Sequence, residues 1–405
     1  MFERRIPEWL RHAPAPSLRG FAALAGVEAV ARGILVSVFP LAMYRALGDA
    51  QAVSQVYFLI GLLSLLTGLL LPWLNRFIPR RWLYACAALV FAAGGVAGMA
   101  GGHWVVVSLT LISVATVSLF VCFNAYVLDY VARVELGRCE TLRMFYSAMG
   151  WTLGPVLGVT LMEWWAPAPF LVSMAAALAM LALFFVMRLG NGKLITRARR
   201  PTANPLRYLG RFFAQPRLVV GWGFAVVRSC GWWIYVVYVP IFAVERGLDA
   251  QTGGIMLSVT NGVLFLTPVM LRWMQRRTVR AAVRTGFALS GLFFAAAWGL
   301  ADQPLLALLV LFLGSCFLVL LDICGGLPFL MAVKPSERTE MSAVYSSFRD
   351  VSGILTPGAA WLVLLWAPLS GVFAVGGLAL GACWALAGTL HPRLGARRIA
   401  PVAAE

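Results

Sequence analysis

Charged residues are scarce in this sequence of 405 residues, where Asp, Glu, Lys and Arg together make up only 12%. Apolar residues make up 61%, against about 45 to 50% in soluble globular domains, so a soluble fold is excluded. Because one bilayer crossing takes about 20 residues of helix, twelve crossings use about 240 residues and leave only short loops. We therefore expect an all-α membrane protein with 12 transmembrane helices and no sizeable soluble domain.

Side chains that hold metals or form disulfides are also few. The three histidines, His12, His103 and His391, lie outside the apolar segments, which excludes an intramembrane zinc or haem site built on histidine. The seven cysteines include no CxxC pair and lie mostly within apolar runs, so a disulfide framework is not expected. We expect no metal and no cofactor.

Catalytic machinery is missing as well. The sequence shows neither a pair of nucleophile and base nor a polar loop large enough to hold an active site. We therefore expect a protein that is not an enzyme, and we keep a membrane-embedded lipid-modifying enzyme only as an alternative from another class.

Apolar runs bounded by charged residues and by Gly or Pro predict two sets of six helices. The first set covers residues 20–42, 51–74, 82–101, 104–130, 143–163 and 169–188. The second set covers residues 218–243, 253–271, 284–300, 304–331, 342–366 and 370–390. The expected domains are thus an N-terminal segment, a six-helix bundle, a linker, a second six-helix bundle and a tail, at residues 1–19, 20–188, 189–217, 218–390 and 391–405.

Positive charge is the abundant kind of charge, with 33 Lys and Arg against 16 Asp and Glu. Of the basic residues, 28 lie in the N-terminal segment, the tail and every second loop, whereas the opposite loops hold only Arg45 and Arg246. By the positive-inside rule, both termini and the linker lie in the cytoplasm. The net charge of +17 thus reflects topology, and we expect no nucleic-acid partner.

The two sets of helices resemble each other at an offset of 200 residues. The tripeptide Asp-Ala-Gln at 49–51 recurs at 249–251, and Pro40 recurs as Pro240. Weak internal symmetry of this kind is expected of the two halves of a secondary transporter. A fold made of two pseudo-symmetric six-helix bundles follows.

This plan of six helices, a linker and six helices resembles the major facilitator superfamily (MFS). Residues 75–81 read NRFIPRR and resemble the family's GxxADRxGRR loop, with Asn for the acid and Pro for the Gly. Residues 150–159 read GWTLGPVLGV and resemble the GxxxGPxxGG element of proton-driven antiporters, with Val for the last Gly. The resemblance implies alternating access in a bacterial inner membrane, with both termini in the cytoplasm. The motifs identify no subfamily.

Ionisable side chains inside the predicted helices are energetically costly, so they are the first candidates for substrate binding or coupling. Glu28 and Arg32 are spaced i,i+4 and can pair with each other. Arg228 occupies the repeat position of Glu28, so a contact between the two that forms or breaks during transport is a second reading. Direct contact with substrate is a third. The remaining candidates of this class are Asp322, Arg349 and Asp350.

Two further features concern the substrate and the proton. Arg228 shares a helical face with Trp232 and Tyr235, which suits an amphipathic organic solute, although ordinary packing of the aromatic rings is equally open. Asp322 has no basic residue within one turn and lies beside Gly325-Gly326, so we expect it to carry the coupling proton better than Glu28, whose carboxylate Arg32 stabilises. An Arg from another helix could instead pair with Asp322. Arg349 and Asp350 point about 100° apart and can serve different partners.

Other candidates lie at the cytoplasmic helix ends or form a stripe of small residues. The charged groups at the cytoplasmic ends are expected to latch loops together more often than to touch substrate, and they are Arg76, Arg80, Arg81, Asp129, Glu140 and Arg143. The stripe lets a neighbouring helix approach closely and Pro155 adds a kink, the glycines being Gly150, Gly154 and Gly158.

These features predict a secondary active transporter for a small organic solute, with proton coupling and with efflux as one direction. An organic-anion or phosphate-ester carrier that uses the three intramembrane arginines is the alternative, and a facilitator without ion coupling is a third form. The expected partners are a small-molecule substrate, protons and the lipid bilayer, and we expect a monomer.

The charge pattern predicts the topology directly. Single cysteines near residues 200 and 395 should react only with reagents that reach the cytoplasm, and those near 49 and 249 only with reagents applied outside. Labelling of the linker from outside would contradict the whole arrangement.

Overall fold

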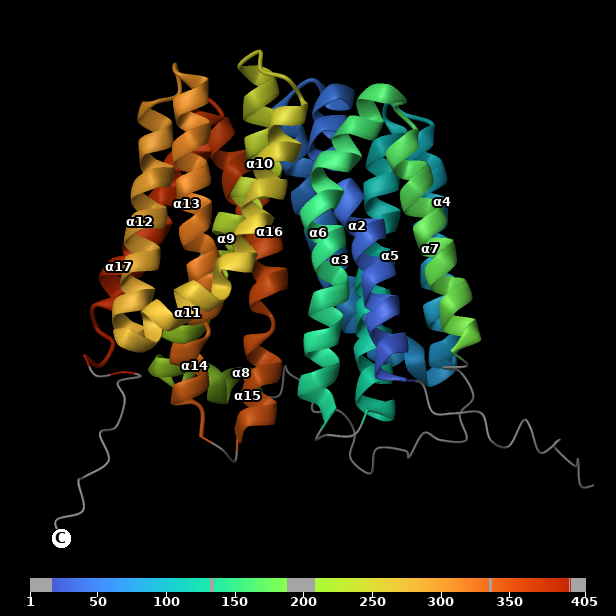
Figure 1. The fold of residues 1–405 in the computed structure, drawn as a ribbon, viewed down its shortest axis with the longest axis horizontal. Helices are drawn as coiled ribbons and strands as arrows, with labels where there is room; N and C mark the ends of the chain where they lie inside the picture. The colour runs from blue at the N-terminus through green and yellow to red at the C-terminus, as the bar shows by residue number, and fades with distance from the viewer. Residues whose placement is uncertain (1–16, 132–134, 188–207, 335–336, 393, 395–405) are drawn as a thin grey trace, which may run out of the picture.

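The structure is a computed structural model that describes residues 17–131, 135–187, 208–334, 337–392 and 394. The described part contains helices and no strands (Figure 1). The first half consists of α2 (Leu18–Leu47), α3 (Ala50–Phe77), α4 (Arg80–Met99), α5 (Trp104–Tyr130), α6 (Leu136–Trp164) and α7 (Ala168–Val186). These six helices match the first six predicted segments.

The second half repeats this pattern with interrupted helices. It contains α8 (Leu209–Phe213), α9 (Pro216–Glu245), α10 (Gln251–Gly262), η3 (Val263–Leu266), α11 (Thr267–Arg276), α12 (Val279–Gly299), α13 (Pro304–Cys324), α14 (Leu327–Ala332), α15 (Arg338–Tyr345), α16 (Phe348–Leu364) and α17 (Ser370–Ala387). Pro268 and Pro328 lie at the starts of α11 and α14, because proline has no N–H to donate and breaks the helical ladder before it.

Each predicted helix is found as one helix or as a chain of short ones. Ten helical segments of the described residues are long and apolar enough to cross a membrane. The two remaining predicted spans correspond to α6 and to α15 with α16, which are related by the offset of 200 residues.

The predicted linker, 189–217, needs a correction in its described part. Residues 209–213 form α8, and α9 already begins at Pro216. Phe212 is fully buried against Leu218, Phe329 and their neighbours, so this stretch packs onto the second half. The rest of the linker, the first 16 residues and residues 395–405 lie outside the described residues.

The helices run between two ends of the bundle. At one end α2 and α9 begin and α7 and α17 finish, and we call it the terminal end; the other is the opposite end (Figure 1). The repeated tripeptide has the same task in both halves. The Asp49 carboxylate accepts from the backbone N–H of Gln51, at 3.1 Å, and the Asp249 carboxylate accepts from that of Gln251, at 2.9 Å.

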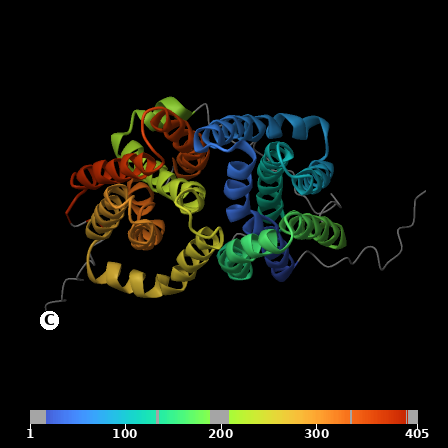
Figure 2. The same ribbon diagram turned by 90° about the horizontal axis from the view of Figure 1, so that it is seen from above.

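The two halves lie side by side, and each contributes two helices to their boundary (Figure 2). On one side α3 packs against α16, and on the other α6 packs against α10. Helices α2 and α9 also contact each other across this boundary. Residues on α2, α9 and the four flanking helices therefore face the boundary between the halves.

Within the first half, α2 and α6 touch backbone to backbone. A Cβ added to Gly150 would lie 2.7 Å from the carbonyl carbon of Ala29, and one added to Gly154 would lie 2.5 Å from that of Gly33. A Cβ at Gly158 would overlap the carbonyl oxygen of Ile34. The stripe of small residues thus holds α6 directly on α2.

Gly158→Ala should destabilise the protein by about 1 to 3 kcal/mol, since the new methyl group meets rigid backbone and not a mobile side chain. Gly223→Ala is the matched control, because Gly223 also lies in a long helix but has no atom within 4 Å of its added Cβ. The control should be neutral or stabilising. Thermal unfolding in detergent measures both variants, and equal midpoints would contradict the role given to Gly158.

Candidate functional site

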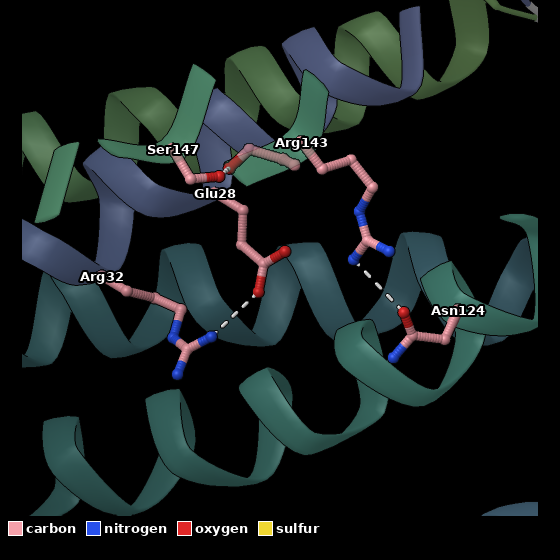
Figure 3. Close-up of polar contacts among 6 residues, drawn as sticks. Glu28, Arg32, Asn124, Arg143 and Ser147 are labelled. Atoms are coloured by element: carbon pink, nitrogen blue, oxygen red, sulfur yellow. Dashed lines mark hydrogen bonds and ion pairs between the residues drawn. The ribbon is translucent and has the colours of Figure 1, made fainter. Parts of the chain in front are cut away.

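Glu28 and Arg32 form an ion pair within α2. Arg32 Nη1 lies 3.1 Å from Glu28 Oε1, as the i,i+4 spacing allows (Figure 3). The guanidinium also lies 5.2 Å from the ring centre of Trp151 on α6. About a third of the Arg32 side chain, 35%, stays exposed. The pair is closed within the first half, and the considered contact of Glu28 with Arg228 is not formed in this conformation.

Arg143 belongs to the same region, where α2, α5 and α6 meet (Figure 3). Its guanidinium donates to Asn124 Oδ1 on α5, at 3.2 Å, and to Glu140 Oε2, at 2.8 Å. It also lies 4.6 Å from the ring centre of Phe123. Arg143 and Glu140, expected to latch loops, therefore pair with each other and join α6 to α5.

The second half contains a corresponding ion pair between two helices. Arg228 Nε on α9 lies 3.3 Å from Asp322 Oδ1 on α13, and the Trp232 indole N–H donates to Asp322 Oδ2 at 3.0 Å. The Asp322 side chain remains 36% exposed, whereas that of Arg228 is 13% exposed. The expectation that Asp322 lacks a basic neighbour holds only along its own helix. The alternative of an Arg from another helix is the one observed.

Tyr235 does not share the exposed aromatic surface expected for it. Its side chain is 1% exposed, and its hydroxyl lies 2.7 Å from Thr260 Oγ1 and 3.3 Å from the carbonyl oxygen of Met256. These partners lie on α10 because α9 is rotated so that Tyr235 points toward that helix. Tyr235 is thus packed between α9 and α10, whereas Trp232 contacts the ion pair.

Arg349 is the cation at the boundary between the halves. Its guanidinium lies 5.6 Å from the ring centre of Phe348 and 5.7 Å from that of Phe120, which belongs to α5 of the first half. Arg228 and Arg32 both repel it, and Asp350 and Glu140 attract it. Within the described part of the chain, neither Arg349 nor Asp350 has an ion-pair partner within 4 Å.

At the terminal end, another of the expected latches joins two helices of the first half. Arg80, the first residue of α4, pairs with Asp129 near the end of α5 and lies 5.4 Å from the ring centre of Tyr126. Arg81 lies over the ring of Trp82, and Arg76 ends α3 without an ion pair to a described residue. This latch connects helices of the first half and does not reach the second half.

Pro155 creates a polar contact between the halves. Because proline has no N–H, the carbonyl of Trp151 four residues earlier loses its helical donor. The side-chain amide of Asn261 on α10 donates to this carbonyl at 2.6 Å. One residue after the proline, the backbone N–H of Val156 donates to Ser258 Oγ at 3.0 Å. The kink of α6 thus exposes backbone groups that α10 of the other half satisfies.

The second boundary between the halves repeats this arrangement without the amide. Pro357 on α16 lacks the N–H that would bond the carbonyl of Gly353. That carbonyl oxygen lies 2.8 Å from a Cβ added to Gly61 on α3. Gly61 and Asn261 are repeat positions at the offset of 200 residues, so a close backbone approach on one side corresponds to a side-chain hydrogen bond on the other.

These contacts lie between the middle of the bundle and the opposite end. Ser54 Oγ and the Tyr238 hydroxyl, 2.8 Å apart, add a buried hydrogen bond there, and Gln251 donates to Glu163 at the margin. All four of these hydrogen bonds between the halves lie away from the terminal end. In this conformation the halves are joined at the opposite end (Figure 1).

The sequence matches the Major Facilitator Superfamily over residues 21–357, most of its length. The chain belongs to this superfamily. It is therefore a multi-pass membrane transporter and not an enzyme. No curated protein sequence matches it.

Solved structures of several other transporters share the fold over nearly the whole chain. The nucleoside transporter NupG has a TM-score of 0.69 at 13% identity and covers 93% of this chain and 100% of its own. A POT family transporter in complex with 5-aminolevulinic acid has 0.74 at 11% identity, covering 92% and 97%. The peptide transporter POT in complex with sulfate has 0.73 at 15% identity, covering 93% and 94%. At these identities the likeness establishes the fold and not the substrate.

Asn261 should hold this superfamily member in the observed conformation. Asn261→Ala leaves the Trp151 carbonyl without a donor, at a cost of about 1 to 3 kcal/mol, which shifts the population toward separation at the opposite end by about 5-fold to 150-fold. A cysteine at Ser54, which is fully buried at the boundary, should then react faster with a maleimide. A cysteine at Ser108, buried inside the first half, should not.

Pro155→Ala provides the matched background for this test. With Ala at 155 the helix supplies its own N–H to the Trp151 carbonyl, so removing the Asn261 amide should cost less. The same acceleration in both backgrounds would show that Asn261 acts through another contact.

Proposed function

We propose that this chain is a secondary active transporter that moves a small organic solute by alternating access of its two halves. The observation that carries this proposal is that the central ion pairs, Glu28 with Arg32 and Arg228 with Asp322, each lie within one half. Breaking an ion pair in a region of low dielectric is costly. Halves that keep their own charges paired can rock about their boundary without that cost.

We further propose that Asp322 carries the coupled proton. It is the acid of a pair with Arg228, it accepts from Trp232, and more than a third of its side chain is exposed. Protonation would remove the charge that holds Arg228 and would free that guanidinium, whereas ionisation would hold it in place. Protonation of Asp322 and release of the Arg228 guanidinium are thus coupled at one carboxylate near the middle of the bundle.

The charge pattern of the loops supports placement in the cell membrane, the bacterial inner membrane, with the terminal end in the cytoplasm. In that orientation the observed conformation is closed on the outside, because the contacts between the halves lie toward the opposite end. The Gly-Pro element at 150–158 supports antiport, and hence efflux, by its family usage.

A second candidate, an organic-anion carrier, is favoured by the state of Arg349. This cation has no acidic partner within 4 Å and is repelled by Arg228 and Arg32. A carboxylate or phosphate ester between the halves would neutralise it and make charge-assisted hydrogen bonds. Loss of uptake of anionic solutes, but not of neutral ones, in Arg349→Gln would select this candidate.

The test is an uptake screen in proteoliposomes with and without a pH gradient. Asp322→Asn mimics the protonated acid, so it should abolish accumulation driven by the gradient and spare counterflow of solute down its own gradient. Asp302→Asn is the matched control, because the Asp302 side chain is fully exposed in a loop. Accumulation by Asp322→Asn at the wild-type level would contradict the role of Asp322, and absence of any solute flux would contradict transport.

A further inference from the structure

Arg284 is a half-buried cation of the second half that the transport site does not use. It lies on α12, six residues into the helix, and its guanidinium lies 5.5 Å from the ring centre of Trp384 on α17. Its Nε is buried and has no hydrogen-bond partner, and Arg284 forms no ion pair with a described residue. Arg280, one turn earlier, is different because it donates to the carbonyl oxygen of Gly388 at 2.5 Å.

A shallow surface cavity of about 430 Å³, largely open to the outside, lies beside this guanidinium. Its lining consists of Ala281, Arg284, Thr285, Ala288, Leu289 and Trp384. Leu292 and Leu378, on the same two helices, are 60% and 70% exposed. Exposed leucines on a membrane-spanning helix indicate the face that meets lipid tails, so the cavity opens toward the bilayer.

The lining residues lie at the depths in the bilayer where the headgroup and the acyl chains of a phospholipid lie. Arg284 lies about 8 Å along the axis from the terminal end of α12, and Trp384 about 5 Å from the end of α17. Ala288 and Leu289 lie one turn deeper, toward the hydrocarbon core. The cation and the indole are thus at headgroup level, and the apolar part of the cavity is at the level of the acyl chains.

The charged residues around the cavity are all positive. The segments 267–299 and 370–394, which contain α11, α12 and α17, hold no Asp or Glu, while Arg276, Arg277 and Arg280 add positive charge beside Arg284. Arg284 is half-buried and its buried Nε has no partner, and a phosphate is the ligand that the planar donors of a guanidinium fit in a bidentate way.

We propose that this cavity binds the phosphate group of an anionic phospholipid, with one acyl chain along Ala288 and Leu289. Arg284 donates to the phosphate, Trp384 stacks on the guanidinium and borders the headgroup, and the neighbouring arginines attract the negative lipid to this face. The site lies on the outer surface of the second half, separate from the boundary where substrate is expected.

Native mass spectrometry of the full-length protein with dioleoyl phosphatidylglycerol or dioleoyl phosphatidylcholine tests the proposal, since these lipids share their acyl chains. Wild type should retain more phosphatidylglycerol than phosphatidylcholine. Arg284→Gln should reduce the retention of phosphatidylglycerol about fivefold or more. Arg76→Gln, which removes an exposed arginine at the terminal end of the first half, away from the cavity, should retain the wild-type amount. Ala281→Phe, which fills the cavity and keeps the charge, should also lose the lipid.

Three results would overturn the lipid site. They are equal retention by Arg284→Gln and wild type, equal retention of the two lipids by wild type, and displacement of phosphatidylglycerol by millimolar glycerol 3-phosphate. The last result would mean that the cavity recognises a free phosphate ester. A thermal unfolding midpoint within a few degrees of wild type shows that each variant is folded. If Arg284→Gln does not fold, Ala281→Phe still tests the site.

Discussion

The arrangement of this transporter depends on the need to pair charges inside the membrane. Each half solves this need by itself, with Glu28 and Arg32 one turn apart on α2, and with Arg228 and Asp322 on α9 and α13. Both pairs contact a tryptophan, Trp151 in the first half and Trp232 in the second. Because no ion pair of the described residues spans the boundary, the halves can separate without exposing an unpaired charge. Arg349 is left as the cation for which a ligand or a change of conformation provides the counter-charge.

The boundary between the halves is built from backbone groups that proline sets free. Pro155 and Pro357 lie in the corresponding helices of the two halves, and each frees a carbonyl that faces the other half. One carbonyl accepts from Asn261, and the other faces Gly61. A hydrogen bond of this kind contributes about 1 kcal/mol net, so such a boundary can open and close at modest cost. Inside the first half, by contrast, the glycine contacts of α6 with the backbone of α2 leave no room for movement.

The sequence predicts those features that depend on spacing along one helix or on the loops. The i,i+4 pair of Glu28 and Arg32 and the positions of the apolar helical segments follow from spacing alone. The pairing of Arg228 with Asp322 does not, because the two residues are 94 positions apart and the rotation of α9 against α13 decides which faces meet. The same rotation buries Tyr235. The contact of Asn261 could have been predicted from the sequence. Asn261 is an amide on an apolar helix at the repeat position of Gly61, and Pro155 indicates which backbone carbonyl lacks a helical donor.

In the proposed alternating access, the halves move as rigid units about the middle of their boundary, so that the two ends open in turn. Distances measured by double electron–electron resonance in nanodiscs, at acidic and at neutral pH, test this movement. Pairs of spin labels span the two halves at each end. Phe77 with Lys334 reports the terminal end and Trp164 with Asp302 the opposite end, all at exposed positions. Phe77 with Val186 reports a distance inside the first half. We expect two populations at each end that change in opposite directions with pH, and one unchanged distance inside the first half. Distances between the halves that stay fixed, or that change together with the internal one, would contradict it.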